Sequence, residues 1–323
     1  MRLSGRIPEE AAGERLDKAL AALFPAYSRA RLTEWLRAGQ VRVDEACPRP
    51  RDKVRGGEWV EVEAAVEGEA PWQAQEMPLD VVYEDEAILV LNKPAGLVVH
   101  PAAGNPDRTL VNALLHYAPE LSAIPRAGVV HRLDKETSGL LVVARTLSAQ
   151  ASLVRQLQER TVKREYDAVV AGVLISGGTV DAPIARHPVY RKRMAVLEGG
   201  KPAVSHYRVL ERFAAHTLVR VALETGRTHQ IRVHMAHVRH PIVGDPVYGA
   251  RLRLPGRCTE TLREVLRGFR RQALHAGRLG LIHPASGKEM AWRAPLPADM
   301  AALVEALREH AAGAEPDEDE ELD

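Results

Sequence analysis

The chain has 323 residues, of which 46% are hydrophobic, so it has ample material for a packed core and is long enough for two domains. No apolar run approaches the roughly 18 residues of a membrane helix, and the start lacks a secretion signal. The two cysteines, Cys47 and Cys258, show no disulfide or zinc spacing. We therefore expect a cytoplasmic protein without a membrane segment. The net charge is +1, but seven acids lie in the last nine residues, which leaves 44 basic against 36 acidic residues elsewhere and indicates a body that meets phosphates.

Residues 14–65 are predicted to form a small domain of two helices and two strands. Apolar residues recur at helical spacing over residues 16–23 and again over residues 32–36, where Ser28 is a candidate N-cap and Gly39 a stop signal. Short alternating segments at Val41 to Val43 and Trp59 to Val62 predict strands. Basic residues are concentrated here, and those of the second helix are the candidate RNA contacts: Arg29, Arg31 and Arg37. Scattered arginines are usually a solvated helix face, so this composition alone does not distinguish the two readings.

Two patterns in this domain favour RNA binding. RLDKAL is followed by SRxxLxxWLxxGxVxVD and then by RGGEWVEV, an arrangement that resembles the S4-type RNA-binding module. That resemblance implies a small α/β domain whose basic helix pair grips structured RNA. After it, residues 66–78 contain Pro71 and Pro78 among Ala, Glu and Gln, and we predict a flexible linker.

Residues 79–311 are predicted to form the larger domain, an α+β fold on a mixed, mostly antiparallel sheet. Helical spacing predicts helices at residues 109–117, 147–158, 229–238 and 300–311. Alternating or apolar runs predict strands at residues 81–83, 87–91, 166–170, 203–210 and 217–223. Residues 312–323 form an acidic tail that we expect to be disordered.

The segment HRLDKETSG, residues 131–139, places Asp134 between two cations, Arg132 and Lys135. Nearby positive charge favours the ionised carboxylate, which can act as a nucleophile or stabilise charge but cannot act as an acid. Apolar, β-branched runs at residues 127–130 and 140–144 flank it and predict strands. A charged segment between two buried strands lies where functional loops are commonly placed.

Three further segments of this domain carry candidate functional groups. NKPAGLVVHP holds Lys93 before a turn, KREYDAVVAG places Tyr166 near the start of a strand, and LETGRTHQIRVHMAH places Arg232 on a helix after a turn. An Asp, a Tyr and an Arg from separate segments could meet only in the folded state.

At these residues the chain resembles the RluA/RluD family of RNA pseudouridine synthases, and most strongly its RluD branch. The resemblance runs from the amino-terminal module to HPASG near Gly287 and rests on long matches: HPAAGNPDRTLVNALLHY, AGVVHRLDKETSGLLVVART, LETGRTHQIRVHMAHVRHPIVGDPVYG and RQALHAGRL. Many members carry Asp where Glu136 stands, a difference outside the catalytic position. The resemblance implies an isomerase that converts specific uridines of 23S ribosomal RNA to pseudouridine by base flipping, without cofactor or metal.

The resemblance also assigns roles to individual residues. Asp134 would be the catalytic carboxylate, which attacks the sugar or the uracil ring or removes a sugar proton to give a glycal. Arg232 would pair with Asp134, Tyr166 would stack on the uracil and help take the ring proton, and Arg132 would fill the gap left by the flipped nucleotide. Two more residues are expected near RNA phosphates: Lys93 and His229.

Two other interpretations stay open on the residues alone. A non-catalytic RNA-binding or ribosome-assembly factor could share the fold, although Asp134 and Arg232 are both present. A metal-dependent hydrolase could use His229, His234 and His237, but their spacing does not match a zinc-binding helix, and no metal site is predicted. The expected partner is a stem-loop of ribosomal RNA in the assembling large subunit, bound by a monomer.

Overall fold

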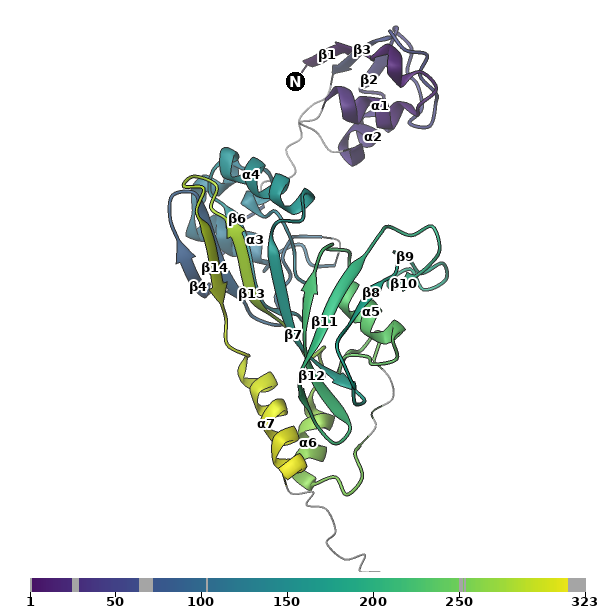
Figure 1. Ribbon diagram of the computed structural model, residues 1–323. Coiled ribbons are helices and arrows are strands. Elements are labelled where there is room, and N and C mark those ends of the chain that lie inside the picture. Colours follow the sequence, from purple (N-terminus) through teal and green to yellow (C-terminus); the bar gives the residue numbers. More distant parts are fainter. Residues whose placement is uncertain are drawn as a thin grey trace, which may run out of the picture. The chain divides into compact units, whose positions relative to one another are not determined.

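The chain divides into two structural units, residues 1–71 and residues 72–323 (Figure 1). The computed structural model describes residues 2–24, 29–63, 72–102, 104–249, 252 and 254–312, without the side chains of residues 2, 30 and 31. The predicted N-cap Ser28, residues 66–71 of the predicted linker and the acidic tail from residue 313 lie outside the described residues.

The first unit packs two helices on a three-stranded antiparallel sheet. The helices are α1 (Leu16–Leu23) and α2 (Arg29–Arg37), preceded by a 3₁₀ turn η1 (Glu9–Ala11), and the strands are β1 (Arg2–Arg6), β2 (Val41–Val43) and β3 (Trp59–Glu63), in the order β1-β3-β2. Alternate residues of β3, Val60 and Val62, enter a core with Leu16, Leu20 and Trp35. Both predicted helices and both predicted strands are confirmed, whereas β1 was missed because RLSGR carries only one large apolar residue.

The second unit is built on one large mixed sheet. Its strands are β4 (Val81–Glu84), β5 (Ile88–Lys93), β6 (Ser138–Ala144), β7 (Lys163–Ala171), β8 (Gly178–Asp181), β11 (Val204–Arg212), β12 (His216–Leu223), β13 (Leu274–Ile282) and β14 (Glu289–Arg293). They follow the order β4-β5-β6-β13-β7-β12-β11-β8, with β14 paired to β13. Only β6 and β13 pair in parallel among the described strands, which confirms the mixed, mostly antiparallel prediction. A separate hairpin joins β9 (Ile184–Arg186) to β10 (Met194–Val196).

Helices cover both faces of this sheet. They are α3 (Leu110–Tyr117), α4 (Leu147–Gln158), α5 (Gln230–His237), α6 (Glu260–Gly268) and α7 (Ala298–Ala312), with 3₁₀ turns η2 (Pro119–Ala123) and η3 (Pro125–Gly128). Figure 1 shows α6 and α7 side by side beneath β12, and α4 at the other end of the sheet. None of the described helices combines the length and apolar surface that a membrane crossing needs.

The central strands read as unbroken apolar runs because both of their faces are buried. Leu141 and Val143 of β6 join the larger core with α3, α6 and α7, whereas the alternate residues Leu140 and Val142 pack in a second core with α4. The two cores hold β6 between them. The segment that precedes β6 therefore ends at a rigidly held strand.

The helix α6 was not predicted, and two predicted segments have a different structure. Residues 127–130 do not form a strand: η3 ends in three consecutive left-handed residues, Arg126, Ala127 and Gly128, and only Val129 makes a bridge, to Val143. A Cβ on Gly128 would lie 1.9 Å from the Ala144 carbonyl oxygen, so this turn requires glycine. An apolar run indicates burial, and here the buried segment is a turn.

Residues 72–78, which the sequence analysis placed in a flexible linker, lie against α3. The Gln73 carbonyl accepts a hydrogen bond from Asn112 Nδ2 at 2.8 Å, and the Gln75 N–H donates to the Asn112 carbonyl at 3.0 Å. Gln75 Oε1 also accepts the Arg108 N–H at 2.7 Å. Polar composition concealed this order because its partners lie more than 30 residues away in the sequence.

Candidate active site

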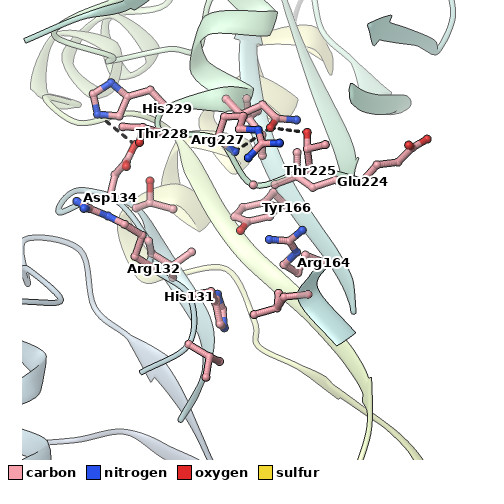
Figure 2. Close-up of a pocket in the computed structure, with 18 of the residues that line it drawn as sticks. His131, Arg132, Asp134, Arg164, Tyr166, Glu224, Thr225, Arg227, Thr228 and His229 are labelled. Atoms are coloured by element: carbon pink, nitrogen blue, oxygen red, sulfur yellow. Dashed lines mark hydrogen bonds and ion pairs between the residues drawn. The ribbon is translucent and has the colours of Figure 1, made fainter. Parts of the chain in front are cut away.

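A cleft of about 650 Å³ opens in the second unit between the segment before β6, strand β7 and the connection from β12 to α5 (Figure 2). Asp134, Tyr166 and Arg232 all line it, so the fold brings together the three residues proposed from separate segments. Among the described lining residues only Asp134 and Glu224 are acidic, whereas five arginines besides Arg232 contribute: Arg126, Arg132, Arg160, Arg164 and Arg227. This excess of positive charge suits a ligand that carries phosphates.

The carboxylate of Asp134 is held by a buried guanidinium. Arg232, only 5% exposed, donates its Nη1–H to Asp134 Oδ2 at 2.9 Å. Its Nε and Nη2 donate to Asp245 Oδ2 at 2.7 Å and Oδ1 at 2.9 Å. The side chain of Asp245 is fully buried, while that of Asp134 is 18% exposed. One cation thus serves two carboxylates, and only Asp134 can reach a ligand in the cleft.

The electrostatics of this trio favour a permanent cation. Burial lowers the pKa of Arg232, but hydrogen bonds and negative charge from Asp245 and Asp134 outweigh that effect and raise its pKa above the usual range. Burial raises the pKa of Asp245, and the guanidinium together with the backbone N–H groups of Tyr248 and Val247 lowers it below the usual range. None of the described residues donates a hydrogen bond to Asp134 Oδ1, so that oxygen is available for chemistry.

The Asp134 loop, residues 131–137, is held by contacts to its backbone. The Thr137 N–H donates to the Asp134 carbonyl at 3.0 Å and closes a turn. Lys135 contributes a carbonyl that accepts the Gly96 N–H at 2.9 Å, and Arg271 Nη1 donates to the Glu136 carbonyl at 3.2 Å. Because these contacts use main-chain atoms, the side chain of Asp134 is left to face the cleft.

A glycine two residues after the loop, Gly139, permits the only parallel pairing described in the sheet. Gly139 has φ +117°, and a Cβ there would lie 2.4 Å from the Ala276 carbonyl oxygen on β13. Any side chain would push β13 away from β6. The glycine of the motif is therefore a packing requirement, and it fixes where the chain after the Asp134 loop joins the sheet.

Tyr166 presents a buried ring to the cleft from β7, where it lies opposite Val221 of β12. The residue is only 7% exposed. Burial raises the pKa of its hydroxyl, the charge of Arg164 opposes this, and Asp134 reinforces it. Figure 2 shows Tyr166 beside Arg164, across from Asp134 and Arg132. The phenol is protonated at neutral pH and offers an aromatic surface.

The predicted RNA-contacting arginines differ in what the structure leaves available. Arg132 is exposed and lines the cleft two residues before Asp134. In the first unit Arg37 is exposed, whereas Arg29 donates to Asp17 at 2.9 Å and so has part of its charge engaged. The side chain of Arg31 lies outside the described part of the chain.

Lys93 is not available for RNA contact in this structure. It is 1% exposed, and Nζ donates to the carbonyls of Pro94 at 2.7 Å, Leu97 at 2.9 Å and Lys135 at 3.0 Å. All three donors of an ammonium group are thereby used. These contacts give Lys93 a structural role in place of the predicted phosphate contact. Its hydrogen bonds connect the NKPAGL turn to the Asp134 loop.

Burial lowers the pKa of Lys93 to about 7, and we expect this to appear in the pH dependence of stability. The unfolded chain holds this proton up to a pH of about 10.4, whereas the folded protein releases it near pH 7. Between these two pH values the unfolded state binds more protons, so Lys93 makes the free energy of unfolding increase as the pH rises. Lys93→Met should lack this rise in urea unfolding measured from about pH 6 to 9. Lys163→Met, at an exposed lysine, is the matched control and should follow the wild type. Equal slopes for all three proteins would mean that Lys93 stays charged when folded.

The three histidines considered for a metal site have separate environments, and His237 is exposed at the end of α5. His234 is buried and contacts Ser205 Oγ and the Ala182 carbonyl, each at 2.9 Å. His229 lines the cleft, with Nδ1 2.7 Å from Tyr248 Oη and Nε2 3.8 Å from Asp134 Oδ2. Within the described residues, no three His, Cys, Asp or Glu side chains form a cluster that could hold a metal ion.

Sequence reasoning missed Asp245 and Tyr248. They follow the apolar pair Ile242 and Val243 in the segment GDPVYG, which entered the sequence analysis only as part of a long match. A lone carboxylate directly after a buried pair is a signal for a buried partner, but it does not identify Arg232 as that partner. The contact depends on how the chain after α5 returns along the helix.

Family models of known proteins match segments of both structural units. The family model for RNA pseudouridylate synthase matches residues 87–237, and the model for the S4 domain matches residues 14–60. The chain is therefore an RNA-modifying isomerase with an S4 RNA-binding domain, and it belongs to the RNA pseudouridylate synthase family.

Relatives similar over almost the whole chain carry one name. The "Ribosomal large subunit pseudouridine synthase D" of Xanthomonas campestris pv. campestris is 58% identical, covering 95% of this chain and 93% of the relative. Proteins of the same name from Pseudomonas aeruginosa and Escherichia coli are 58% and 56% identical, each over 95% of this chain and over 96% and 95% of their own lengths.

Two solved human structures share the fold. "Human RNA Pseudouridylate Synthase Domain Containing 4" aligns with a TM-score of 0.56 and 28% identity, over 71% of this chain and 93% of its own. "Human RNA Pseudouridylate Synthase Domain Containing 1" gives 0.54 and 28%, over 75% and 97%. These likenesses support the α+β pseudouridine synthase fold predicted from the sequence.

Proposed function

We propose that this enzyme converts specific uridines of 23S ribosomal RNA to pseudouridine, with Asp134 as its catalytic carboxylate. The observation that carries the proposal is the Asp134–Arg232 hydrogen bond, which orients one partly exposed carboxylate in a basic cleft beside Tyr166. The names of the relatives that match 95% of the chain support the large-subunit RNA as the substrate.

The reaction needs little more than a positioned carboxylate. The bond from C1′ of ribose to N1 of uracil breaks, the uracil turns, and a bond forms from C1′ to C5. The proton on C5 is lost and N1 gains a proton, so the product is an isomer of the substrate. Asp134 attacks the sugar or the uracil ring, or removes a sugar proton to give a glycal. A glycosidase requires two carboxylates across the bond, whereas here the detached base must be retained and water excluded.

The other lining residues take roles that follow from their chemistry. Tyr166 stacks on the target uracil, because it presents a buried aromatic ring to the cleft. Because its hydroxyl is protonated, Tyr166 helps remove the C5 proton only as a relay that passes its own proton on as it accepts the one from C5. Arg132 fills the gap left by the flipped nucleotide, since it is exposed at the cleft two residues before Asp134. The remaining cleft arginines contact phosphates, which supplies affinity more than sequence choice.

Tritium release tests the activity directly. Large-subunit RNA labelled at C5 of uridine loses tritium when the C5 proton is replaced by the bond to ribose, so the purified protein should release tritium in proportion to the pseudouridine formed. Mapping of pseudouridines in RNA from cells with and without the gene would identify the positions. Absence of release from both naked RNA and assembling subunits would refute the proposed substrate.

We further propose that the S4-type unit targets the enzyme to a stem-loop in the assembling large subunit, in the cytoplasm and as a monomer. Its exposed arginine Arg37 and its match to the S4 domain support RNA contact. A duplex or stem must be opened at one nucleotide before the glycosidic bond can enter the cleft, so a second binding unit that recognises structured RNA has a clear use.

Deletion of residues 1–71 is expected to weaken binding to structured ribosomal RNA and make its affinity less dependent on salt, because phosphate contacts are lost. The cut should fall at residue 71, since Gln73 and Gln75 hydrogen-bond Asn112 in the second unit. Filter binding over a range of salt concentrations measures the effect, and activity on a short unstructured RNA serves as the control for an intact cleft. Unchanged affinity and salt dependence on intact ribosomal RNA would refute the targeting role.

A further inference from the structure

A second side chain besides Arg232 approaches the Asp134 carboxylate. His229 Nε2 lies 3.8 Å from Asp134 Oδ2, and Figure 2 shows the imidazole turned toward Asp134. The other ring nitrogen, Nδ1, lies 2.7 Å from Tyr248 Oη, and the two rings meet edge to face at 5.5 Å. His229 therefore connects Tyr248 to the proposed catalytic group.

The direction of these hydrogen bonds follows from the donors available. The backbone N–H of Met194, on β10, donates to Tyr248 Oη at 2.7 Å. The hydroxyl oxygen accepts that bond, and among the described residues its single proton has no acceptor within hydrogen-bond distance other than His229 Nδ1, so we infer that the hydroxyl donates to Nδ1. An imidazole that accepts at Nδ1 carries its proton on Nε2, which is the nitrogen that faces Asp134.

The surroundings of His229 keep the ring neutral. Burial lowers its pKa, and this effect outweighs the attraction of nearby carboxylates. The charged and titratable groups that face it are Asp134 and Arg132 from the Asp134 loop, Arg232 from its own helix, and Asp245 and Tyr248 from the segment after α5. An imidazolium would place a second cation beside a carboxylate that Arg232 already pairs.

Tyr248 is itself fixed by the same network. Its backbone N–H donates to Asp245 Oδ1 at 3.0 Å, and its ring lies 5.0 Å from the guanidinium carbon of Arg232. His229 precedes α5 in the left-handed region, with φ +58°, a conformation that is costly for most residues other than glycine and is adopted mainly by Asn, Asp and His. The imidazole is thus held at this place at the expense of backbone strain.

We propose that Tyr248 is a positioning residue that fixes His229 as the Nε2–H tautomer, and that this neutral imidazole donates a second hydrogen bond to Asp134 during the reaction. The proposal rests on the function proposed above. Shortening the 3.8 Å separation to a hydrogen bond of about 2.9 Å requires only a small side-chain rotation when RNA fills the cleft. A neutral donor orients the carboxylate without adding a second neutralising charge.

The tautomer can be measured without any activity assay. In ¹⁵N NMR spectra of the full-length protein labelled at histidine, His229 should show a protonated Nε2 and an unprotonated Nδ1 at neutral pH, with assignment by comparison with His229→Gln. In Tyr248→Phe the ring remains beside Arg232 but the donor to Nδ1 is lost, so the tautomers should mix. An Nδ1–H tautomer or an imidazolium in the wild type would overturn the proposal, whatever the RNA substrate is.

Two substitutions of His229 separate the imidazole's role from that of the backbone. Gln can place an N–H near the position of Nε2, whereas Asn reaches only the position of Nδ1 but suits the left-handed backbone better. We expect kcat for tritium release to be highest in the wild type, about threefold to tenfold lower in His229→Gln, and lower again by a similar factor in His229→Asn. Of the two variants, His229→Asn should have the higher melting temperature. A higher kcat for Asn than for Gln would mean that the backbone alone matters and would overturn the proposal.

Tyr248→Phe adds a pH signature that a structural role would not produce. Without the hydroxyl, Nδ1 is free to take a proton, the pKa of His229 rises, and an imidazolium forms beside Asp134 as the pH falls. We expect kcat to decrease roughly tenfold with little change in KM, and its decline toward acid to begin at higher pH than in the wild type. The double variant with His229→Gln should lose this displacement. An unchanged kcat and pH profile in Tyr248→Phe would contradict the proposal, whereas an inactive wild type would instead refute the proposed substrate.

Discussion

Asp134→Asn is expected to reduce tritium release from C5-labelled uridine by on the order of 10⁴-fold or more, as is typical when a reacting carboxylate is lost. The amide has nearly the size of the carboxylate and its oxygen can still accept the hydrogen bond from Arg232 Nη1, so the loop should keep its geometry. What disappears is the negative charge and lone-pair reactivity of the second oxygen, which no described residue engages. The measurement is single-turnover tritium release with enzyme in excess over RNA.

The matched control is Glu136→Gln, which removes a carboxylate two residues away in the same loop. Only the Glu136 carbonyl, not its side chain, receives the hydrogen bond from Arg271, so this variant should keep most of the wild-type rate. RNA affinity of Asp134→Asn should stay within about threefold of the wild type, because the basic lining is intact. Substantial activity in Asp134→Asn would exclude Asp134 as the reacting group in all three routes.

Asp245→Asn is expected to cost the second unit about 3–5 kcal/mol of unfolding free energy, the usual effect of breaking a buried ion pair. Arg232 would keep its charge with its main partner neutralised, and the amide can accept only one of the two hydrogen bonds that Asp245 now receives from it. Arg232 would also lose its fixed orientation toward Asp134, so kcat should fall together with stability. Hydrogen exchange at the amides of α5 measures the stability of this region, and tritium release measures the rate.

Glu211→Gln provides the comparison for burial. Glu211 accepts paired hydrogen bonds from Arg308 at 2.9 and 2.8 Å, as Asp245 does from Arg232, but this pair is solvent-exposed. Loss of an exposed pair should cost below about 1 kcal/mol and leave the rate unchanged. Similar losses of unfolding free energy in Asp245→Asn and Glu211→Gln would show that burial does not increase the contribution of the Arg232–Asp245 pair.

The trio of Asp134, Arg232 and Asp245 explains how a partly exposed carboxylate can be held rigidly. A guanidinium has a planar set of donors, and Asp245 occupies one edge with two hydrogen bonds. Of the three N–H donors that remain, one on Nη1 is thereby held in a fixed direction and donates to Asp134. A lysine could not transmit orientation in this way, because its three donors rotate about a single bond.

Much of the fold was predictable from local pattern. The alternation of Val60 and Val62 identified a half-buried strand, and the apolar run through Leu140 and Val142 identified a strand buried on both faces. The helix at Leu147–Gln158 was predicted with the bounds that the structure has. These features depend on periodicity within a few residues, which the sequence displays directly. The resemblance added Asp134, Tyr166 and Arg232 as a set.

The burial of polar groups was decided by tertiary structure alone. A lysine in NKPAG reads as a surface cation, yet Lys93 donates to a carbonyl 42 residues away and has no access to solvent. The run before the Asp134 loop reads as a strand, yet the close approach of Gly128 to Ala144 makes it a turn. In both cases the local sequence pattern does not include the distant residue with which the segment interacts.

The sequence by itself determined the class of protein, the elements and the residue types of the site. The tertiary structure decided which of those residues face the cleft and which support them: Asp245 behind Arg232, and Tyr248 behind His229. The physical reason is that propensity and periodicity are local, whereas a hydrogen bond such as that from Arg232 to Asp134 joins atoms 98 residues apart and forms only when the sheet brings them together.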